Sequence, residues 1–225
     1  LALELTAQEA RGPGAAICAA GAALLYAFSR GAWSQSVLAE VYTLNAAFLG
    51  ATLWALAKAE RQGDARFLLL AAYLFGLGLT NHLLLLAAGP ALLITAWRLA
   101  RVRIIGVWTA ILLPVLSLWG LTLDLYLPVR AALNPEFSWG APVTAGRLWW
   151  LLSGAQYARN FFARSVPDAV RHLLPGRWEA DFGWGLVAVA LGVAAVLIRR
   201  PGRTAAAWAA LVASLLLLSL MVLLS

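Results

Sequence analysis

The sequence predicts an all-α integral membrane protein with several membrane-spanning helices. Of its 225 residues, 63% are hydrophobic and only 12% are charged, and the apolar residues form long runs. A soluble domain carries roughly a quarter charged residues, whereas a helix needs ~20 apolar residues to cross the hydrocarbon layer of a bilayer. Because runs of about this length recur along most of the chain, a multi-spanning helix bundle is the expected fold.

Seven membrane segments are expected, and short polar breaks separate most of them. The third and fourth segments form one apolar stretch that Thr80-Asn81-His82 interrupts. This stretch could be one long helix, but a polar trio in mid-membrane would then face lipid or a cavity. Two shorter helices that meet at the trio are therefore favoured. The expected segments cover residues 15–29, 37–57, 67–79, 83–97, 104–127, 183–198 and 204–224, the fifth ending at Pro128.

The basic residues set the expected orientation of these segments. The net charge is +7, which could suggest nucleic acid, but the Arg residues cluster in short breaks between apolar runs. Loops 58–66, 98–103 and 199–203 hold nine basic residues together, whereas the break 30–36 holds one. The positive-inside rule places the three basic loops in the cytoplasm, so residues 129–182 are expected outside it. No nucleic-acid partner is expected.

The extracytoplasmic segment 129–182 is expected to contain amphipathic helices that lie in the membrane interface. Asn134-Pro135 and residues 139–142 (WGAP) are turn signals. Thr144 can cap a helix that contains Leu148 and Leu152, and residues 165–168 (SVPD) are typical of a capping box. The chain lacks an initial Met and ends in an apolar run, so we expect residues 1–225 to be a single membrane domain from a longer chain.

Polar residues near the start of the second segment are the first candidates for a functional site, because ionisable groups are costly in a membrane. If this segment is helical from Val37, then Ser36, Glu40 and Thr43 share one polar stripe. Glu40 could be an acidic group in a cavity at the outer surface. Alternatively, it could be a carboxylate at a helix start that the helix dipole stabilises.

Two further polar pairs are expected at the same membrane face. Asn81 and His82 could donate to a polar ligand, with His82 as an acid or base, or they could satisfy the backbone of a broken helix. Asp124 and Arg130 could form an interfacial ion pair of small energetic value, or Arg130 could bind a phosphate through its planar guanidinium. The topology places these four residues near Glu40, so a shared extracytoplasmic site is expected.

Known metal and nucleotide signatures are not found in the sequence. It has no zinc-type cluster of His and Cys, no phosphate-binding glycine loop and no nucleophile elbow. No metal ligands are therefore predicted, and a requirement for a divalent metal is left open. Gly76 and Gly78 form no dinucleotide fingerprint; they lie in a membrane helix, where small residues allow close packing.

Three stretches, in their order and spacing, carry a family resemblance. They are residues 33–45 (WSQSVLAEVYTLN), residues 76–82 (GLGLTNH), and residues 125–130 (LYLPVR) with Asn134-Pro135 and Ser138-Trp139-Gly140. They resemble the bacterial membrane proteins grouped as domain of unknown function 2723, relatives of the animal protein O-mannosyltransferase called transmembrane protein 260. The resemblance covers most of residues 29–162.

The resemblance implies a GT-C type glycosyltransferase in the bacterial inner (plasma) membrane, with its active site facing the periplasm or exterior. Such an enzyme transfers a sugar, here mannose or a similar hexose, from a polyprenyl-phosphate carrier to a protein or glycan acceptor. The implied partners are thus membrane lipid, the lipid-linked sugar and the acceptor. The donor substrate is the only small molecule implied. The family pattern falls on Trp33, Gln35, Glu40, Tyr42, Asn45, Asn81, His82, Arg130, Asn134 and Trp139.

Physical roles can be assigned to these positions. Arg130 and His82, with Asn81, would bind the lipid phosphate, because a charged phosphate needs charge-assisted donors. Glu40 and Asn45 would shape the sugar or acceptor pocket. The remaining pocket positions are Trp33, Gln35, Tyr42, Asp124, Asn134 and Trp139. From the residues alone, an interface anchor is the favoured interpretation of Trp139.

One departure from the family concerns the catalytic base. Family members carry an acidic motif in a first outward loop, and nothing before Trp33 matches it. Glu40 is the candidate base within this chain, and the full-length protein rather than this part alone is expected to be the enzyme. The alternative functions are a transporter or flippase of lipid-linked intermediates and a non-catalytic scaffold subunit. A transporter would place polar residues through the whole membrane depth.

Overall fold

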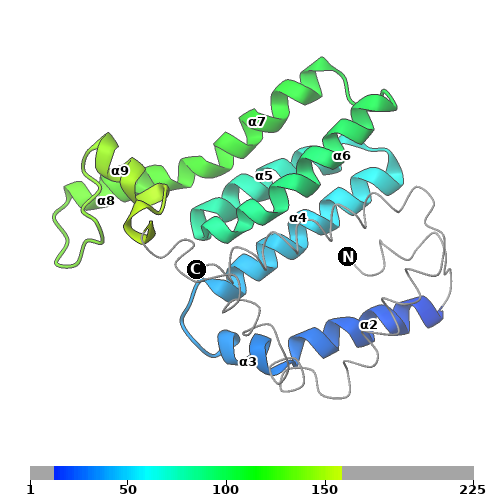
Figure 1. Cartoon of the computed structure of the whole chain (residues 1–225), viewed down its shortest axis with the longest axis horizontal. Helices are drawn as coiled ribbons and strands as arrows, with labels where there is room; N and C mark the ends of the chain where they lie inside the picture. The colour runs from blue at the N-terminus through cyan, green and yellow to red at the C-terminus, as the bar shows by residue number, and fades with distance from the viewer. Residues whose placement is uncertain (1–12, 159–225) are drawn as a thin grey trace.

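A computed structural model of the chain describes residues 13–158, and every regular element in this range is helical (Figure 1). The expected segments 183–198 and 204–224 and the expected capping box at residues 165–168 lie outside the described residues. The helices are α2 (Pro13–Ala27), α3 (Arg30–Ser36), α4 (Tyr42–Gln62), α5 (Ala65–Asn81), α6 (Gly89–Arg101), α7 (Val107–Leu121), α8 (Tyr126–Ala132) and α9 (Ala145–Leu152), with the 3-10 helices η1 (Leu83–Ala88), η2 (Thr122–Leu125) and η3 (Ala155–Tyr157).

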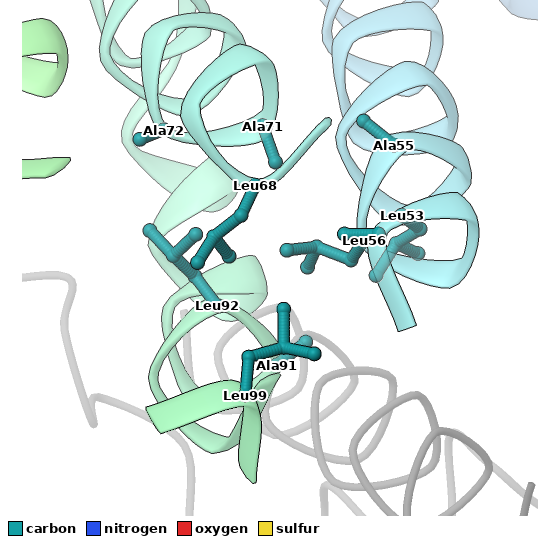
Figure 2. Packing of buried hydrophobic residues seen from close by; sticks show 10 residues of the cluster. Leu53, Ala55, Leu56, Leu68, Ala71, Ala72, Ala91, Leu92 and Leu99 are labelled. Atoms are coloured by element: carbon teal, nitrogen blue, oxygen red, sulfur yellow. The ribbon is translucent and has the colours of Figure 1, made fainter. Parts of the chain in front are cut away.

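Helices α4, α5 and α6 pack around one buried apolar cluster (Figure 2). The cluster consists of Leu and Ala side chains, and alanines let helix backbones approach closely. Its members are Leu53, Ala55, Leu56 and Ala59 of α4, Leu68, Ala71 and Ala72 of α5, and Ala91, Leu92 and Leu99 of α6.

The chain reverses direction at the polar trio in the long apolar stretch. Helix α5 ends at Asn81, and η1 and α6 then return along α5 and α4. Leu68 near the start of α5 and Leu99 near the end of α6 belong to the same cluster, so the two helices are antiparallel. The structure thus shows two helices that meet at the trio, the arrangement that was favoured over one long helix.

Helix α7 runs parallel to α5 and crosses it very closely. The Ser117 hydroxyl donates to the backbone oxygen of Ala72 at 3.0 Å. A Cβ on Gly76 would overlap the Ser117 carbonyl, and a Cβ on Gly120 would overlap the backbone of Gly76 and Leu77. The two glycines therefore set the spacing of these helices, which is the close packing predicted for small residues in membrane helices.

Two helical stretches in the described residues are long and apolar enough to cross a membrane: Leu83–Arg101 with 19 residues and Val107–Ala132 with 26. The fifth segment was expected to end at Pro128, but the helical stretch continues through α8 to Ala132. The bounds of the membrane-embedded part stay a prediction. Pro128 lies in the first turn of α8, where a proline needs no donated backbone hydrogen bond.

The predicted start of the second segment also needs correction. Residues 30–36, expected as a polar break, form α3, and α4 begins at Tyr42 rather than at Val37. Ser36 lies at the end of α3, where its hydroxyl donates to the Trp33 carbonyl at 2.8 Å. The Val37 N–H makes the last bond of α3, to the Trp33 carbonyl. The Glu40 N–H then bonds to the Leu38 carbonyl two residues back, so a non-helical turn separates α3 from α4.

The basic loops 58–66 and 98–103 lie at one end of the packed helices. Arg98 of α6 and Glu60 of α4 form an ion pair at 2.9 Å. Burial raises the pKa of Glu60, and the Arg98 guanidinium opposes part of that rise. The Lys58 ammonium lies over the rings of Trp54 and Phe67, at 4.8 and 4.6 Å from their centroids. The membrane side of this end stays a prediction.

We predict that Gly120→Ala destabilises the protein by about 1–3 kcal/mol, because the new methyl group forces α5 and α7 apart. Thermal unfolding in detergent would measure the loss. Gly50→Ala is the matched control, because Gly50 lies inside α4 and a Cβ added there would meet no atom within 4 Å. This control should raise stability by up to about 1 kcal/mol. Equal effects of the two substitutions would contradict the close crossing.

Candidate functional site

Several of the predicted site residues meet at the end of the bundle opposite the basic loops, where α5 ends and α4 begins (Figure 1). The Asn81 amide Nδ2 donates to the backbone oxygen of Val41 at 2.9 Å. The Tyr42 ring lies against the His82 imidazole, with centroids 5.4 Å apart and planes at 44°. These two contacts join the motif at residues 33–45 to the motif at residues 76–82.

His82 connects the two helices of the reversal. Its backbone is extended, and its N–H donates to the Gly78 carbonyl at 3.1 Å to cap α5. Its Nδ1 accepts the backbone N–H of Leu84 at 3.0 Å and so caps η1. A side-chain cap is worth about 1 kcal/mol. The ring is partly buried, and burial lowers the pKa of His82. His82 therefore satisfies the backbone of a broken helix, one of the two roles considered for it.

Asn45 is a buried polar side chain one helical turn beyond Val41. It is 6% exposed, and its Oδ1 has no hydrogen-bond partner. Asn45 shares a face of α4 with Val41, which accepts from Asn81, and with Phe48, which a Cβ on Gly78 would meet. It therefore lies on the side of α4 that faces the end of α5. A buried acceptor without a donor costs about 1–3 kcal/mol, so this buried oxygen would gain a partner if a hydroxyl or amide group were to reach it.

Helix α3 holds Trp33 and Gln35. Trp33 stacks on Phe28 with centroids 5.8 Å apart and planes at 18°. The Thr43 hydroxyl of α4 donates to the backbone oxygen of Gln35 at 3.0 Å. Trp33 is exposed and Gln35 is half-buried. The Thr43 bond brings α3 to the start of α4, beside the Tyr42–His82 contact.

The prediction that Ser36, Glu40 and Thr43 share one helical stripe is wrong, because a non-helical turn separates α3 from α4. The Glu40 backbone N–H donates to the Leu38 carbonyl at 2.8 Å within this turn. The Glu40 side chain is exposed. Its role as a base stays a prediction, with a position two residues before α4 rather than on it.

Asp124 is buried, at 8% exposed, on η2 directly after α7. Because α5 and α7 are parallel, and Gly120 meets Leu77, four further residues place Asp124 at the level of Asn81. Helix η2 also contacts α5. Within residues 13–158 no ion pair joins Asp124 to Arg130, so the interfacial ion pair is not observed. Arg130 is exposed in the last turn of α8.

Asn134 and Trp139 lie in the loop between α8 and α9. Asn134 and Ala141 have positive φ values of 48° and 40°, and Gly140 has a φ of 69°, so both expected turns are present. Trp139 is 72% exposed. Thr144 caps α9 through a 3.3 Å bond from the Arg147 N–H, as expected. Within the described residues, no side-chain hydrogen bond, ion pair or ring contact joins Asn134 or Trp139 to Tyr42 or His82.

The described part of the chain contains no group of three or more His, Cys, Asp or Glu side chains that could hold a metal ion. The contacts that assemble this end were partly invisible in the sequence. Val41 takes part through its carbonyl, and a backbone acceptor leaves no pattern in the residue types. The Gln35 carbonyl is a second case of this kind.

Residues 3–102 match the family model described as the protein O-mannosyl-transferase TMEM260 N-terminal domain. This part of the chain is related to the TMEM260 family. The match includes α3, α4, α5 and α6, and thus the Asn81–Val41 and Tyr42–His82 contacts. Asp124, Arg130, Asn134 and Trp139 lie beyond the matched residues. No curated protein and no solved structure matches the chain.

We predict that Asn81→Ala loosens the turn at residues 37–41, because the side-chain bond to the Val41 carbonyl is lost. Such a bond contributes about 1 kcal/mol, so hydrogen exchange at residues 37–45 should rise several-fold. Thr80→Ala is the matched control, because the Thr80 hydroxyl bonds only to the Leu77 carbonyl of its own helix, at 2.7 Å. Unchanged exchange in Asn81→Ala would contradict the assigned contact.

Proposed function

We propose that this chain is part of a GT-C type membrane glycosyltransferase that uses a polyprenyl-phosphate sugar. It would transfer mannose or a similar hexose to a protein or other acceptor on the extracytoplasmic side. The observation that supports the proposal best is the gathering of motif residues Tyr42, Asn45, Asn81 and His82 at one helix end. These residues lie within the part of the chain that is related to an O-mannosyltransferase family.

The proposed reaction is a displacement at the anomeric carbon of the sugar. The acceptor hydroxyl oxygen bonds to this carbon while the bond from the carbon to the phosphate oxygen breaks. The phosphate leaves with the electron pair, and a base takes the hydroxyl proton. Donors near the leaving phosphate stabilise its charge, which is the proposed role of Arg130, His82 and Asn81. Glu40 is the proposed base within this chain, and Asn45 would contact the sugar or acceptor.

An apolar surface is available for the lipid tail of such a donor. Helix α7 exposes large apolar side chains along its length, and it ends next to η2 and α8, which carry Asp124 and Arg130. A polyprenyl chain could lie along this surface while its phosphate reaches the polar end. The exposed apolar residues of α7 are Val107, Trp108, Ile111, Leu112, Val115, Leu118 and Trp119.

The buried cluster between α4, α5 and α6 gives less support to a transporter. In the described part of the chain this cluster consists of Leu and Ala, and the buried polar side chains at the middle of α4 and α6, Thr52 and Thr95, are uncharged. A path for a sugar or phosphate headgroup would need polar side chains through the membrane depth. The candidate polar residues instead lie at the end where α5 stops.

We predict that Arg130→Ala weakens binding of polyprenyl-phosphate mannose by about tenfold or more, because a charge-assisted donor to phosphate is lost. Arg130→Lys should bind at an intermediate strength, because it keeps the charge without the planar pair of donors. Binding and mannose transfer would be measured with the full-length protein in nanodiscs.

The control for this experiment is Arg101→Ala, at the basic end of the bundle, where the guanidinium lies over the Trp97 ring at 4.7 Å. It should leave donor binding unchanged. The proposed function would be excluded by a wild-type protein that neither binds nor uses any polyprenyl-phosphate sugar. Transport of labelled lipid without sugar transfer would favour the flippase alternative.

A further inference from the structure

We infer that His82 is held as the neutral imidazole with its proton on Nε2, and that this N–H donates to a phosphate oxygen of the lipid-linked donor. The second half rests on the proposed function. The first half rests on the hydrogen bond from the Leu84 backbone N–H to the His82 Nδ1, at 3.0 Å. A backbone N–H can only donate, so Nδ1 must supply a lone pair.

Protonation at Nδ1 would place two N–H groups against each other and uncap η1. The doubly protonated ring and the tautomer with its proton on Nδ1 are both disfavoured for this reason. The remaining neutral form carries its proton on Nε2, on the far side of the ring from η1. Burial acts in the same direction, because it lowers the pKa of the His82 imidazole.

The surroundings of the ring leave Nε2 as its only free polar atom. Tyr42 packs against the ring, and the residues of η1 that follow, Leu83 to Ala88, are all Leu or Ala. The ring itself is only partly buried. The Nε2–H is therefore free to donate to a ligand, and a phosphate oxygen is a strong acceptor. In this tautomer Nε2 has no lone pair, so His82 cannot be the general base, and that task is left to a carboxylate.

The tautomer can be read directly by 15N NMR of histidine-labelled full-length protein in nanodiscs. This sequence contains two histidines, His82 and His172, and a His82→Asn spectrum assigns the His82 signals. We expect the Nε2–H pattern at pH 8 and again at about pH 6.5, where an ordinary histidine is half protonated. An Nδ1–H pattern, or an imidazolium at about pH 6.5, would overturn the inference.

This titration is a demanding test because of the groups near the ring. The titratable or charged groups on the elements at this end are Arg30 on α3, Glu40 and Tyr42 at the start of α4, Asp124 on η2, and Tyr126 and Arg130 on α8. A carboxylate close to the ring would favour the imidazolium. A neutral ring at about pH 6.5 would therefore show that the η1 cap and burial outweigh that attraction.

Two isosteric variants separate the cap from the donor. His82→Asn keeps an acceptor near the position of Nδ1 and loses the Nε2–H, whereas His82→Gln keeps a donor near the position of Nε2. Probed with polyprenyl phosphate and polyprenyl-phosphate mannose, His82→Asn should keep its unfolding temperature but bind about tenfold or more weakly. His82→Gln should bind within about threefold of wild type.

The binding results distinguish a failure of the Nε2 donor role from a failure of the proposed function. Wild-type binding by His82→Asn, or equal losses in both variants, would overturn the donor role of Nε2. If the NMR shows the Nε2–H tautomer but the wild-type protein binds neither probe, the proposed function and its phosphate ligand both fail. If His82→Asn loses the same affinity for polyprenyl phosphate as for polyprenyl-phosphate mannose, the contact of His82 is with the phosphate. If His82→Asn loses affinity only for polyprenyl-phosphate mannose, the contact of His82 is with the sugar, and the inferred contact with the phosphate is overturned.

Discussion

The helix reversal at His82 is the constraint on which the other arrangements depend. An apolar stretch as long as residues 67–97 would satisfy its backbone most simply as one continuous helix. The chain instead breaks because one side chain replaces the missing backbone partner, with Nδ1 of His82 accepting the Leu84 N–H. The returning helix α6 then packs on α4 and α5 and completes the buried Leu and Ala cluster.

Because α5 stops at Asn81, its last residues also form the polar end of the bundle. Asn81 reaches the carbonyl of Val41, and the Tyr42 ring covers one side of His82. The close crossing of α5 and α7 depends on Gly76 and Gly120, and its parallel register brings Asp124 to the same level. A single reversal and one glycine crossing thus bring together residues that lie far apart in the sequence.

Local chemistry made part of this fold predictable. The trio at residues 80–82 marked the break, Thr144 marked the start of α9, and the small residues of α5 marked a close packing face. The structure differed from the sequence-based expectations where backbone conformation decides where a helix starts or ends. The turn between α3 and α4 moved Glu40 off the helix, and Pro128 fitted the first turn of α8 instead of ending the helix. The Val41 and Gln35 carbonyls organise the polar end, and carbonyls have no residue signature.

Cysteine accessibility tests most directly the claim that this polar end forms one surface facing away from the cytoplasm. In a Cys18→Ala background, single cysteines would replace Ser36 and Ala132 at the polar end, and Gln62 and Ala100 at the basic end; all four side chains are exposed. A membrane-impermeant maleimide should label the first two positions in intact cells and the last two only after permeabilisation. Labelling of Ser36→Cys and Ala132→Cys from opposite sides of the membrane would contradict the account.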